Sequence, residues 1–518
     1  MALGGFFRLH PLIVVGFDEP YHLGGLFYEF SRQIAAQGFA LPMTIPYYSA
    51  GGIPFAYPPL GFYAQAALME LFHPPLFVTV NLLPPLVTLF SLPAFYWMML
   101  QYVGGGQESE QQPLALIALF AFALIPNAFS NPIEAAGLAE AFGLLALLLY
   151  LGWLFRFERA PGVRAGVLAG IFLGLCVLSS PGSAYAAALV SVLFFAKALV
   201  AGIRGRDFSA PGWLLLTALV GLLLSAPYWL TVVDRHGASI YITSVAAEHD
   251  QRLLLRLQSL AGFSASQGVF GFVWAWLVFA GALWASLNRR FFVVAMLLAF
   301  WMIPREGEWL LAVPAAMMAA MGGLHVLWPL VHKSLPADWA EPSAFHWRGR
   351  PPCGSQTRPP LAPGLLAVLL VSLVLVNALL ADSQAITNAD WRLSPARVAA
   401  LNDLRDALPP GARLMVSGNG ALQEWSPSLL RREVLNTPFG LEWQPDELAH
   451  VDAINRALEA HDLRAALTAV EDYTGDKEIY LLASPEDLAI LLLSAPQGTA
   501  ITPVVATPEL TLSLVEVE

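Results

Sequence analysis

The chain has 518 residues, of which 57% are hydrophobic and only 13% charged, and its mean hydropathy is +0.60. These proportions exclude an ordinary soluble globular protein and indicate a polytopic membrane protein. The net charge of −11 is uneven, because residues 398–518 hold 19 acidic and 7 basic residues. An acidic soluble part therefore follows a membrane part, and its lack of a basic patch argues against nucleic acid as a partner.

The N-terminal apolar stretch, residues 1–15, precedes the polar segment Gly16-Phe17-Asp18-Glu19-Pro20-Tyr21-His22. It lacks the basic region and the cleavage site of a signal peptide, and it is shorter than the roughly 20 residues that a full span needs. We expect either a short embedded first helix or a start that omits residues upstream.

A helix is predicted to begin at Asp18, which can cap it, with Glu19 and Pro20 in the first turn and Gly38 as its stop. Five apolar residues would share one of its faces: Leu23, Leu26, Phe27, Phe30 and Ile34. Such an amphipathic helix is expected to lie along the membrane surface within a first outer loop, residues 18–55.

Apolar segments then recur at 56–72, 76–103, 112–129, 136–157, 163–178, 184–202, 212–233, 266–287, 290–303, 308–331 and 363–381. The longer ones can each cross a hydrocarbon core of about 30 Å. Clusters of Lys and Arg mark cytoplasmic connections by the positive-inside rule, at 156–164, 197–206, 289–290 and 333–358. The intervening loops and the acidic C-terminal part are then outside the cytoplasm.

Counting membrane crossings back from these cytoplasmic connections places residues 18–55 in the cytoplasm if 56–72 and 76–103 are both single crossings. Two alternatives restore the outer position: 56–72, which opens with Tyr57-Pro58-Pro59, is re-entrant, or the Pro-interrupted stretch 76–103 is split. The sequence leaves both open.

Residues 334–362 are rich in Pro, Arg and Ser and predict a flexible cytoplasmic loop. Beyond them, the pattern becomes that of a small α/β domain, with helices near 394–408, 446–466 and 485–493 and strands near 413–417 and 478–483. We therefore predict a transmembrane domain at 1–381 and an acidic extracytoplasmic α/β domain at 382–518.

The acid pair, the surface helix ending in Gly, the Gly52-Ile53-Pro54 turn and Tyr57-Pro58-Pro59-Leu60 resemble the first outer loop of GT-C glycosyltransferases. Within that family the chain looks like the bacterial and archaeal membrane proteins of the protein-mannosyltransferase and aminoarabinose-transferase kind. The resemblance is best over residues 10–70 and looser to about 330. It implies an α-helical polytopic protein of the plasma membrane with about 11–13 transmembrane helices.

The resemblance further implies transfer of a sugar, with inversion, from a polyprenyl-phosphate donor to a protein, lipid or surface-glycan acceptor at the outer membrane face. Asp18 is then the expected general base, although an Asp before a helix is also a common N-cap. Glu19 is expected either in the catalytic site or as a partner of the helix dipole. His22 could hold the base or the donor phosphate, or be ordinary polar surface.

Two further stretches are similar to later outer loops of the family, residues 131–140 and Ile303-Pro304-Arg305-Glu306. Arg305 is the candidate for the donor phosphate, with an ion pair to Glu306 or Glu308 as the alternative. Glu134 and Glu140 could bind acceptor hydroxyls or a divalent cation such as Mg²⁺ or Mn²⁺, and metal use stays open. Tyr57 could stack on a sugar or anchor the chain at the interface.

Other features argue for a different function. Relatives often carry a histidine where this chain has Ser180, and the apolar N-terminus is short. The alternative is a non-catalytic scaffold that joins a membrane complex through its acidic outer domain. A transporter is disfavoured, because the spans show no paired, Gly-broken halves. Trp425 and Trp443 are predicted to pack inside the C-terminal domain, with a platform for carbohydrate as the alternative.

Overall fold

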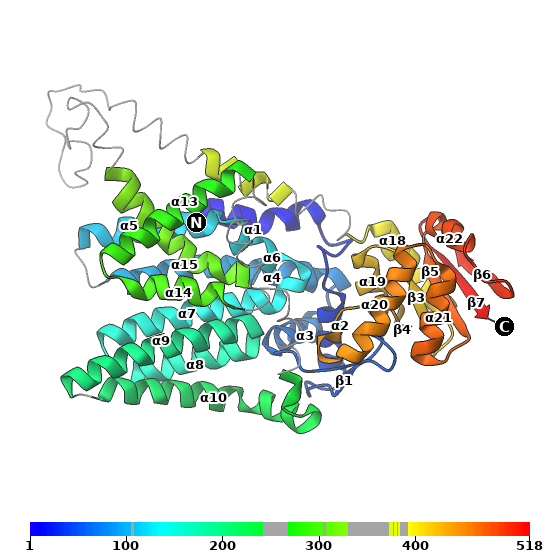
Figure 1. Cartoon of the computed structure of the whole chain (residues 1–518), viewed down its shortest axis with the longest axis horizontal. Coiled ribbons are helices and arrows are strands. Elements are labelled where there is room, and N and C mark those ends of the chain that lie inside the picture. Colours follow the sequence, from blue (N-terminus) through cyan, green and yellow to red (C-terminus); the bar gives the residue numbers. More distant parts are fainter. Residues whose placement is uncertain are drawn as a thin grey trace.

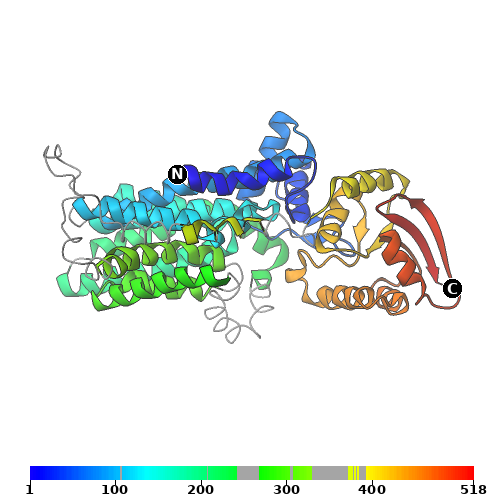
Figure 2. The same ribbon diagram turned by 90° about the horizontal axis from the view of Figure 1, so that it is seen from above.

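The computed structural model of the chain describes residues 1–104, 108–206, 208–241, 268–303, 307–329, 372–376, 378–380, 382–383 and 392–517. Figures 1 and 2 show an elongated molecule in which a bundle of long helices is joined at one end to a smaller α/β domain. The first helix, α1 (Ala2–Val15), runs toward that junction. Residues 16–55 therefore leave the bundle at the end where the α/β domain is attached.

The bundle consists of apolar helices of very different lengths. After α1 they are α3 (Leu60–Phe72), α4 (Leu76–Val103), α5 (Glu108–Leu124), α7 (Leu138–Arg159), α8 (Val163–Ser179), α9 (Pro181–Gly205), α10 (Ser209–His236), α13 (Gly268–Leu287), α14 (Phe291–Trp301) and α15 (Gly307–Gly322). Within the described residues, five helical stretches are long and apolar enough to cross a membrane: α4, α7, α9, α10 and Trp309–Leu327. A sixth is counted if the bent pair Gln112–Leu124 and Pro126–Ile133 forms one span.

The surface of the bundle has the character expected of a lipid-facing protein. Helix α10 has a mean hydropathy of 1.8 over its most apolar stretch, yet it exposes Leu215, Leu222 and Leu223. Helix α7, by contrast, is largely buried between α4 and α8. Exposed leucines on so apolar a helix belong in hydrocarbon, so the predicted α-helical, polytopic membrane fold is confirmed.

The first two segments after residue 55 differ in a way that bears on the crossing count. Helix α4 is continuous over 28 residues despite Pro84, Pro85 and Pro93, so the prediction that 76–103 might be split is wrong. Helix α3 has only 13 residues, a length of about 20 Å, which is too short to cross the hydrocarbon core. The alternative in which residues 56–72 do not cross is therefore favoured.

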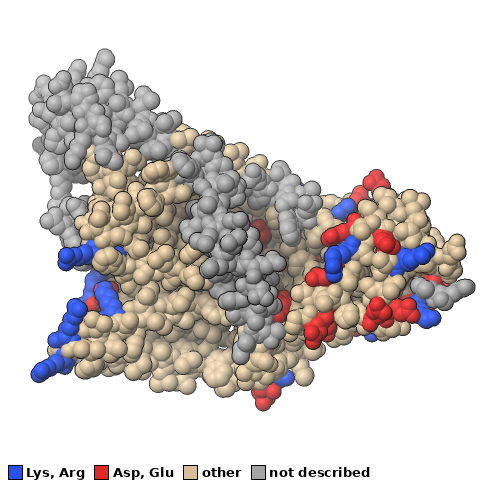
Figure 3. All heavy atoms as spheres, in the orientation of Figure 1, with Lys and Arg blue, Asp and Glu red and all other residues tan. Residues whose placement is uncertain are grey.

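Two of the predicted cytoplasmic connections, at 156–164 and 197–206, meet at one end of the bundle. Lys197 of α9 forms an ion pair with Glu158 of α7, and the Arg159 guanidinium donates to the carbonyl of Leu100 at the end of α4, 3.2 Å away. Figure 3 shows Lys and Arg gathered at the bundle end remote from the α/β domain. The charge pattern and the fold thus give the bundle one basic end, and the α/β domain is attached at the other.

A five-stranded sheet forms the centre of the C-terminal domain. Its strands lie in the order β4-β3-β5-β7-β6, with β3 parallel to β4 and β5, and with β7 antiparallel to β5 and β6. Their bounds are β3 (Arg413–Val416), β4 (Glu433–Val434), β5 (Glu478–Ala483), β6 (Thr499–Ala506) and β7 (Thr511–Val517).

Helices cover both faces of this sheet, because successive side chains of a strand point to opposite sides. Leu414 and Val416 of β3 pack in one apolar cluster with α18 and α19, whereas Met415 packs in another with α20, α21 and α22. The helices are α18 (Pro395–Ala407), α19 (Gly420–Leu430), α20 (Pro445–Glu459), α21 (Leu463–Thr474) and α22 (Pro485–Leu492). The small α/β domain predicted from the sequence is therefore present.

The amphipathic helix of the first outer loop starts later than predicted. Helix α2 spans Gly25–Ala36, so Asp18 is not its N-cap, and Gly24 occupies that position. The predicted apolar face is otherwise correct, since Leu26, Phe30 and Ile34 are buried, and the chain turns at Gly38 with a φ of 63°. The helix packs between α3 and α19 and thus joins the bundle to the C-terminal domain.

Candidate functional site

The segment between α1 and α2, residues 16–24, carries the acid pair and is called the acid-pair segment below. Asp18 is exposed, whereas Glu19, Tyr21 and His22 are buried. The chain turns sharply here, with a φ of 74° at Gly16 and of 64° at His22. A non-glycine residue in this left-handed region is uncommon and persists only where surrounding contacts impose it.

Asn81 of α4 supplies several of those contacts. Its Nδ2 donates to the carbonyl oxygens of Gly16 at 2.9 Å and of Glu19 at 2.8 Å, and its Oδ1 accepts from the Tyr21 backbone nitrogen at 2.9 Å. The amide is 2% exposed. One buried side chain thus satisfies three backbone groups and holds Asp18 in a turn of fixed shape.

Two acid–base pairs connect the N-terminal part to the start of the C-terminal domain. Glu19 forms an ion pair with Arg392, and His10 Nδ1 of α1 lies 2.6 Å from Asp382 Oδ2. Asp382 follows the last apolar segment, and Arg392 precedes α18. The two ends of the connection between bundle and domain are therefore both fixed to residues near the acid pair. Glu19, predicted in the catalytic site, is engaged in a charge pair beside Asp18.

His22 and Glu134 are brought together, although 112 positions separate them in the chain. His22 Nδ1 lies 3.5 Å from Glu134 Oε1, in the turn that follows the short helix α6 (Ser130–Ile133). The Glu134 side chain is 23% exposed. Burial, assisted by the negative charge of Glu424, raises the pKa of Glu134 to about 8. The polar-surface alternative for His22 is wrong, because its side chain is buried against Tyr21 and this carboxyl group.

Glu424 of α19 is a site residue that sequence reasoning did not select. Its Oε2 accepts from the Gly24 nitrogen at 2.6 Å and its Oε1 from the Leu26 nitrogen at 3.4 Å, so it caps α2 from another domain. Burial raises the pKa of Glu424 to about 7, while the N–H groups of Gly24, Leu26 and Gly25 act in the opposite direction. The sequence feature that could have pointed to Glu424 is its position as a single acidic residue beside Trp425 in an apolar stretch.

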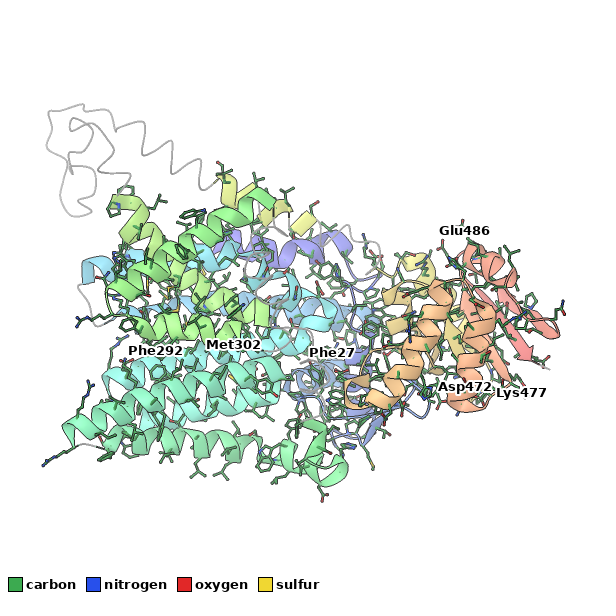
Figure 4. The ribbon with its side chains drawn as sticks, in the orientation of Figure 1. Phe27, Phe292, Met302, Asp472, Lys477 and Glu486 are labelled. Atoms are coloured by element: carbon green, nitrogen blue, oxygen red, sulfur yellow. The ribbon has the colours of Figure 1, made fainter. Side chains whose placement is uncertain are left out.

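The other predicted site residues lie in varied surroundings. Tyr57 is buried in an aromatic cluster with Phe27, Phe30, Phe62 and Trp443, whose ring centroid is 5.9 Å away, so packing accounts for much of its surface. Figure 4 shows Phe27 of this cluster at the junction of bundle and domain. Glu140 lies partly buried in the first turn of α7, where a helix N-terminus favours a carboxylate. Arg305, Glu306 and the side chain of Glu308 lie outside the described residues.

Two further predictions concern packing and metal. Trp425 is fully buried and its Nε1 donates to the His22 carbonyl at 3.1 Å, so it packs across the domain junction and not only inside the C-terminal domain. Ser180, which stands where relatives often carry histidine, caps α9 by accepting from the Ser183 nitrogen at 3.1 Å. In the described part of the chain, no three His, Cys, Asp or Glu side chains converge as metal ligands.

No protein-family model matches the chain, and no curated protein matches it in sequence. Solved structures match over nearly its whole length. ArnT from Cupriavidus metallidurans bound to undecaprenyl phosphate has 15% identity and a TM-score of 0.57, covering 98% of this chain and 97% of ArnT.

An oligosaccharyltransferase from Archaeoglobus fulgidus gives a TM-score of 0.58 at 14% identity over 96% of this chain and 72% of its own. The mycobacterial arabinofuranosyltransferase AftD gives 0.52 at 15% identity over 99% of this chain and 41% of its own. The predicted α-helical membrane fold with a small C-terminal α/β domain is confirmed, and the chain has the membrane fold of the GT-C glycosyltransferases. Against the predicted 11–13 transmembrane helices, the described residues contain five candidate spans, or six with the bent pair.

Proposed function

We propose that the protein is an inverting glycosyltransferase that moves a sugar from a polyprenyl-phosphate carrier to an acceptor. The observation that carries the proposal is the placement of Asp18. It is an exposed carboxylate on a turn held by Asn81, at the end of a GT-C bundle where the α/β domain is attached. A structural neighbour of the same fold binds undecaprenyl phosphate, which supports a lipid-linked donor.

Asp18 is proposed as the general base, because it combines exposure with a fixed position. In an inverting transfer, the acceptor hydroxyl attacks the anomeric carbon, its proton passes to the carboxylate, and the carrier phosphate leaves with the electrons of the broken C–O bond. Glu19 is better suited to holding this turn through Arg392 than to moving a proton. Arg305 remains the proposed ligand of the departing phosphate. A Mg²⁺ or Mn²⁺ ion stays a prediction and is needed for none of these steps.

The membrane orientation is part of the proposal. The basic end of the bundle would be in the cytoplasm and the C-terminal domain outside, by the positive-inside rule. Lys477 is exposed on the C-terminal domain and is seen in Figure 4 far from the bundle. A Lys477→Cys variant should react with a membrane-impermeant maleimide in intact cells. Reaction only after the cells are opened would refute this orientation.

The test of the function compares Asp18→Asn with Asp472→Asn, an exposed acid on α21 that lies far from the acid pair. Membranes containing each variant are supplied with undecaprenyl phosphate carrying a radiolabelled sugar. Transfer should fall by at least about 10²-fold in Asp18→Asn, the scale of a lost general base, and stay unchanged in the control. Undiminished transfer by Asp18→Asn would rule out the base assignment.

The non-catalytic scaffold remains the second candidate, and the buried capping role of Ser180 is the observation that favours it. It predicts that the wild-type chain transfers no sugar from any polyprenyl-phosphate donor. Purification from native membranes would then yield a stoichiometric complex without bound polyprenyl lipid.

A further inference from the structure

Helix α19 of the C-terminal domain lies directly across the start of α2. The first N–H groups of a helix have no partner within it, and a side chain just before the helix usually accepts from them. Here the residue in that position is Gly24, which has no side chain. The Glu424 carboxylate takes over the role, with its Oε2 2.6 Å from the Gly24 nitrogen.

Hydrogen bonds on either side of the Glu424–Gly24 contact also hold α19 close to the backbone at the start of α2. Trp425 Nε1 donates to the His22 carbonyl at 3.1 Å, and Ser428 Oγ donates to the Gly25 carbonyl at 2.8 Å. A Cβ atom on Gly25 would lie 2.6 Å from the backbone oxygen of Glu424. Only glycine at position 25 therefore permits α19 to contact the backbone of α2. The contact requires both Gly25 and Glu424, which lie 399 positions apart in the chain.

The opposite side of the acid-pair segment is held by the bundle. Asn81 fixes the backbone from Gly16 to Tyr21, and Glu424, Trp425 and Ser428 fix it from His22 to Leu26. The geometry of residues 16–26 is thus set jointly by α4 and α19. Without the second set, His22 would lose the contact on its carbonyl and α2 would begin uncapped.

The loop after α2 also joins the C-terminal domain. Tyr48 forms a bridge to Val434 of β4, and its hydroxyl donates to the Glu424 carbonyl at 2.9 Å. A single apolar cluster contains Tyr28, Phe77 and Trp425 together with the sheet. The first outer loop and the C-terminal domain therefore share one core, which argues against an independent appended domain.

We propose that Glu424 is a positioning residue: by capping α2 from the C-terminal domain, it fixes the backbone from His22 to Leu26, directly after the turn that carries Asp18, so that this domain forms part of the transferase centre. The inference rests on the proposed function, since it concerns the geometry in which the base works. Glu424 acts through the backbone and contacts no reacting atom.

The test uses the full-length chain in lipid nanodiscs and compares Glu424→Gln with Glu447→Gln. Glu447 is a matched control, because it also joins the two parts, accepting from Ser49 Oγ at 2.9 Å and from Tyr473 at 2.8 Å. Through Ser49 it contacts the other end of the first outer loop. Glu424→Asp, which keeps the charge on a shorter side chain, serves as the conservative variant.

We expect amide hydrogen exchange at residues 22–28 to rise about tenfold in Glu424→Gln, as for a helix that loses its cap, and to stay unchanged in Glu447→Gln. The kcat for sugar transfer should fall about tenfold or more while KM for the lipid donor stays within about twofold, because positioning affects the reacting geometry and not donor binding. Glu424→Asp should recover part of both changes.

The outcomes separate the possible failures. Unchanged exchange in Glu424→Gln overturns the capping role, and raised exchange with unchanged kcat overturns the positioning role. A fall in kcat equal to that of Glu447→Gln would mean general loss of the domain contact and would also overturn it. A wild-type chain without transfer activity refutes the proposed function and the positioning role with it, whereas the exchange measurement still decides the cap.

Discussion

His22 of the acid-pair segment and Glu134 of the turn after α6 face each other, with His22 Nδ1 3.5 Å from Glu134 Oε1. No local sequence pattern around either residue predicts that the two side chains lie together. His22 belongs to the acid-pair segment, and burial together with the negative charge of Glu424 raises the pKa of its partner Glu134 to about 8.

The first prediction concerns pH. Since the ordinary pKa of Glu134 is 4.5 and the folded-state pKa is about 8, the folded chain holds a proton that the unfolded chain has lost between those values. Stability should therefore fall as the pH rises through this window. Glu134→Gln, which cannot ionise, should reduce the difference between the melting temperatures at pH 5 and pH 8 by a few degrees. Glu486→Gln, at an exposed site on α22, should keep the wild-type difference.

The second prediction concerns Asn81. Asn81→Leu removes the partner of the buried Glu19 carbonyl and Tyr21 N–H and of the partly buried Gly16 carbonyl. Each unsatisfied buried group costs about 1–3 kcal/mol, so the variant should lower the unfolding free energy by several kcal/mol and loosen Asp18. Thermal unfolding in detergent measures the effect. Thr79→Val, at a buried site on the same helix whose hydroxyl makes one long contact of 3.4 Å, should change little. Equal effects of the two variants would contradict the clamp.

The third prediction concerns the close approach of α19 to α2. Gly25→Ala places a methyl group 2.6 Å from the Glu424 backbone oxygen, so one helix must move. Overpacking of this kind costs about 1–3 kcal/mol. Gly212→Ala in α10 meets no atom within 4 Å and should be neutral or slightly stabilising. Limited proteolysis should release the C-terminal domain faster from Gly25→Ala, and an unchanged cleavage rate would refute the close contact.

The fourth prediction concerns the ion pair between Glu19 and Arg392. Glu19 is buried and the Arg392 side chain is 34% exposed, so replacing Arg392 leaves a buried carboxylate without this ion pair, and replacing Glu19 removes the same ion pair from Arg392. Glu19→Gln and Arg392→Gln should each destabilise the chain, by about 1–3 kcal/mol. The double variant should cost less than the two single variants together. Strict additivity in this double-mutant cycle would show that the pair does not couple.

Features with local causes were predictable from the sequence. Ser394 accepts from the Arg397 nitrogen at 3.3 Å and caps α18 at the predicted start, and the apolar run at 478–483 forms β5 with the predicted bounds. Other elements were missed. The predicted helix at 446–466 is two helices, because the chain breaks at Ala460, His461 and Asp462, and β6 was hidden by Pro503, which an edge strand with a bulge tolerates.

The site was only half predictable, for a physical reason. Asp18 followed the local rule for an N-cap, but Asn81 holds its backbone in a turn and Glu424 provides the cap of α2 from another domain. Asn81, Arg392 and Glu424 act through long-range contacts that no local pattern encodes. What the sequence did indicate correctly was that the acid pair follows the first apolar helix and precedes an amphipathic helix.

The sheet bridge between Tyr48 and Val434 has a consequence for synthesis of the chain. The ribosome makes Tyr48 nearly 400 residues before its partner Val434. Tyr48, Gly24 and Gly25 can therefore form their contacts with the C-terminal domain only after the whole bundle has been synthesised. Contacts so distant in sequence form slowly and late. The junction therefore becomes complete only when translation is almost finished, and a chain that stops short of α19 would be inserted in the membrane with the start of α2 held by the bundle alone.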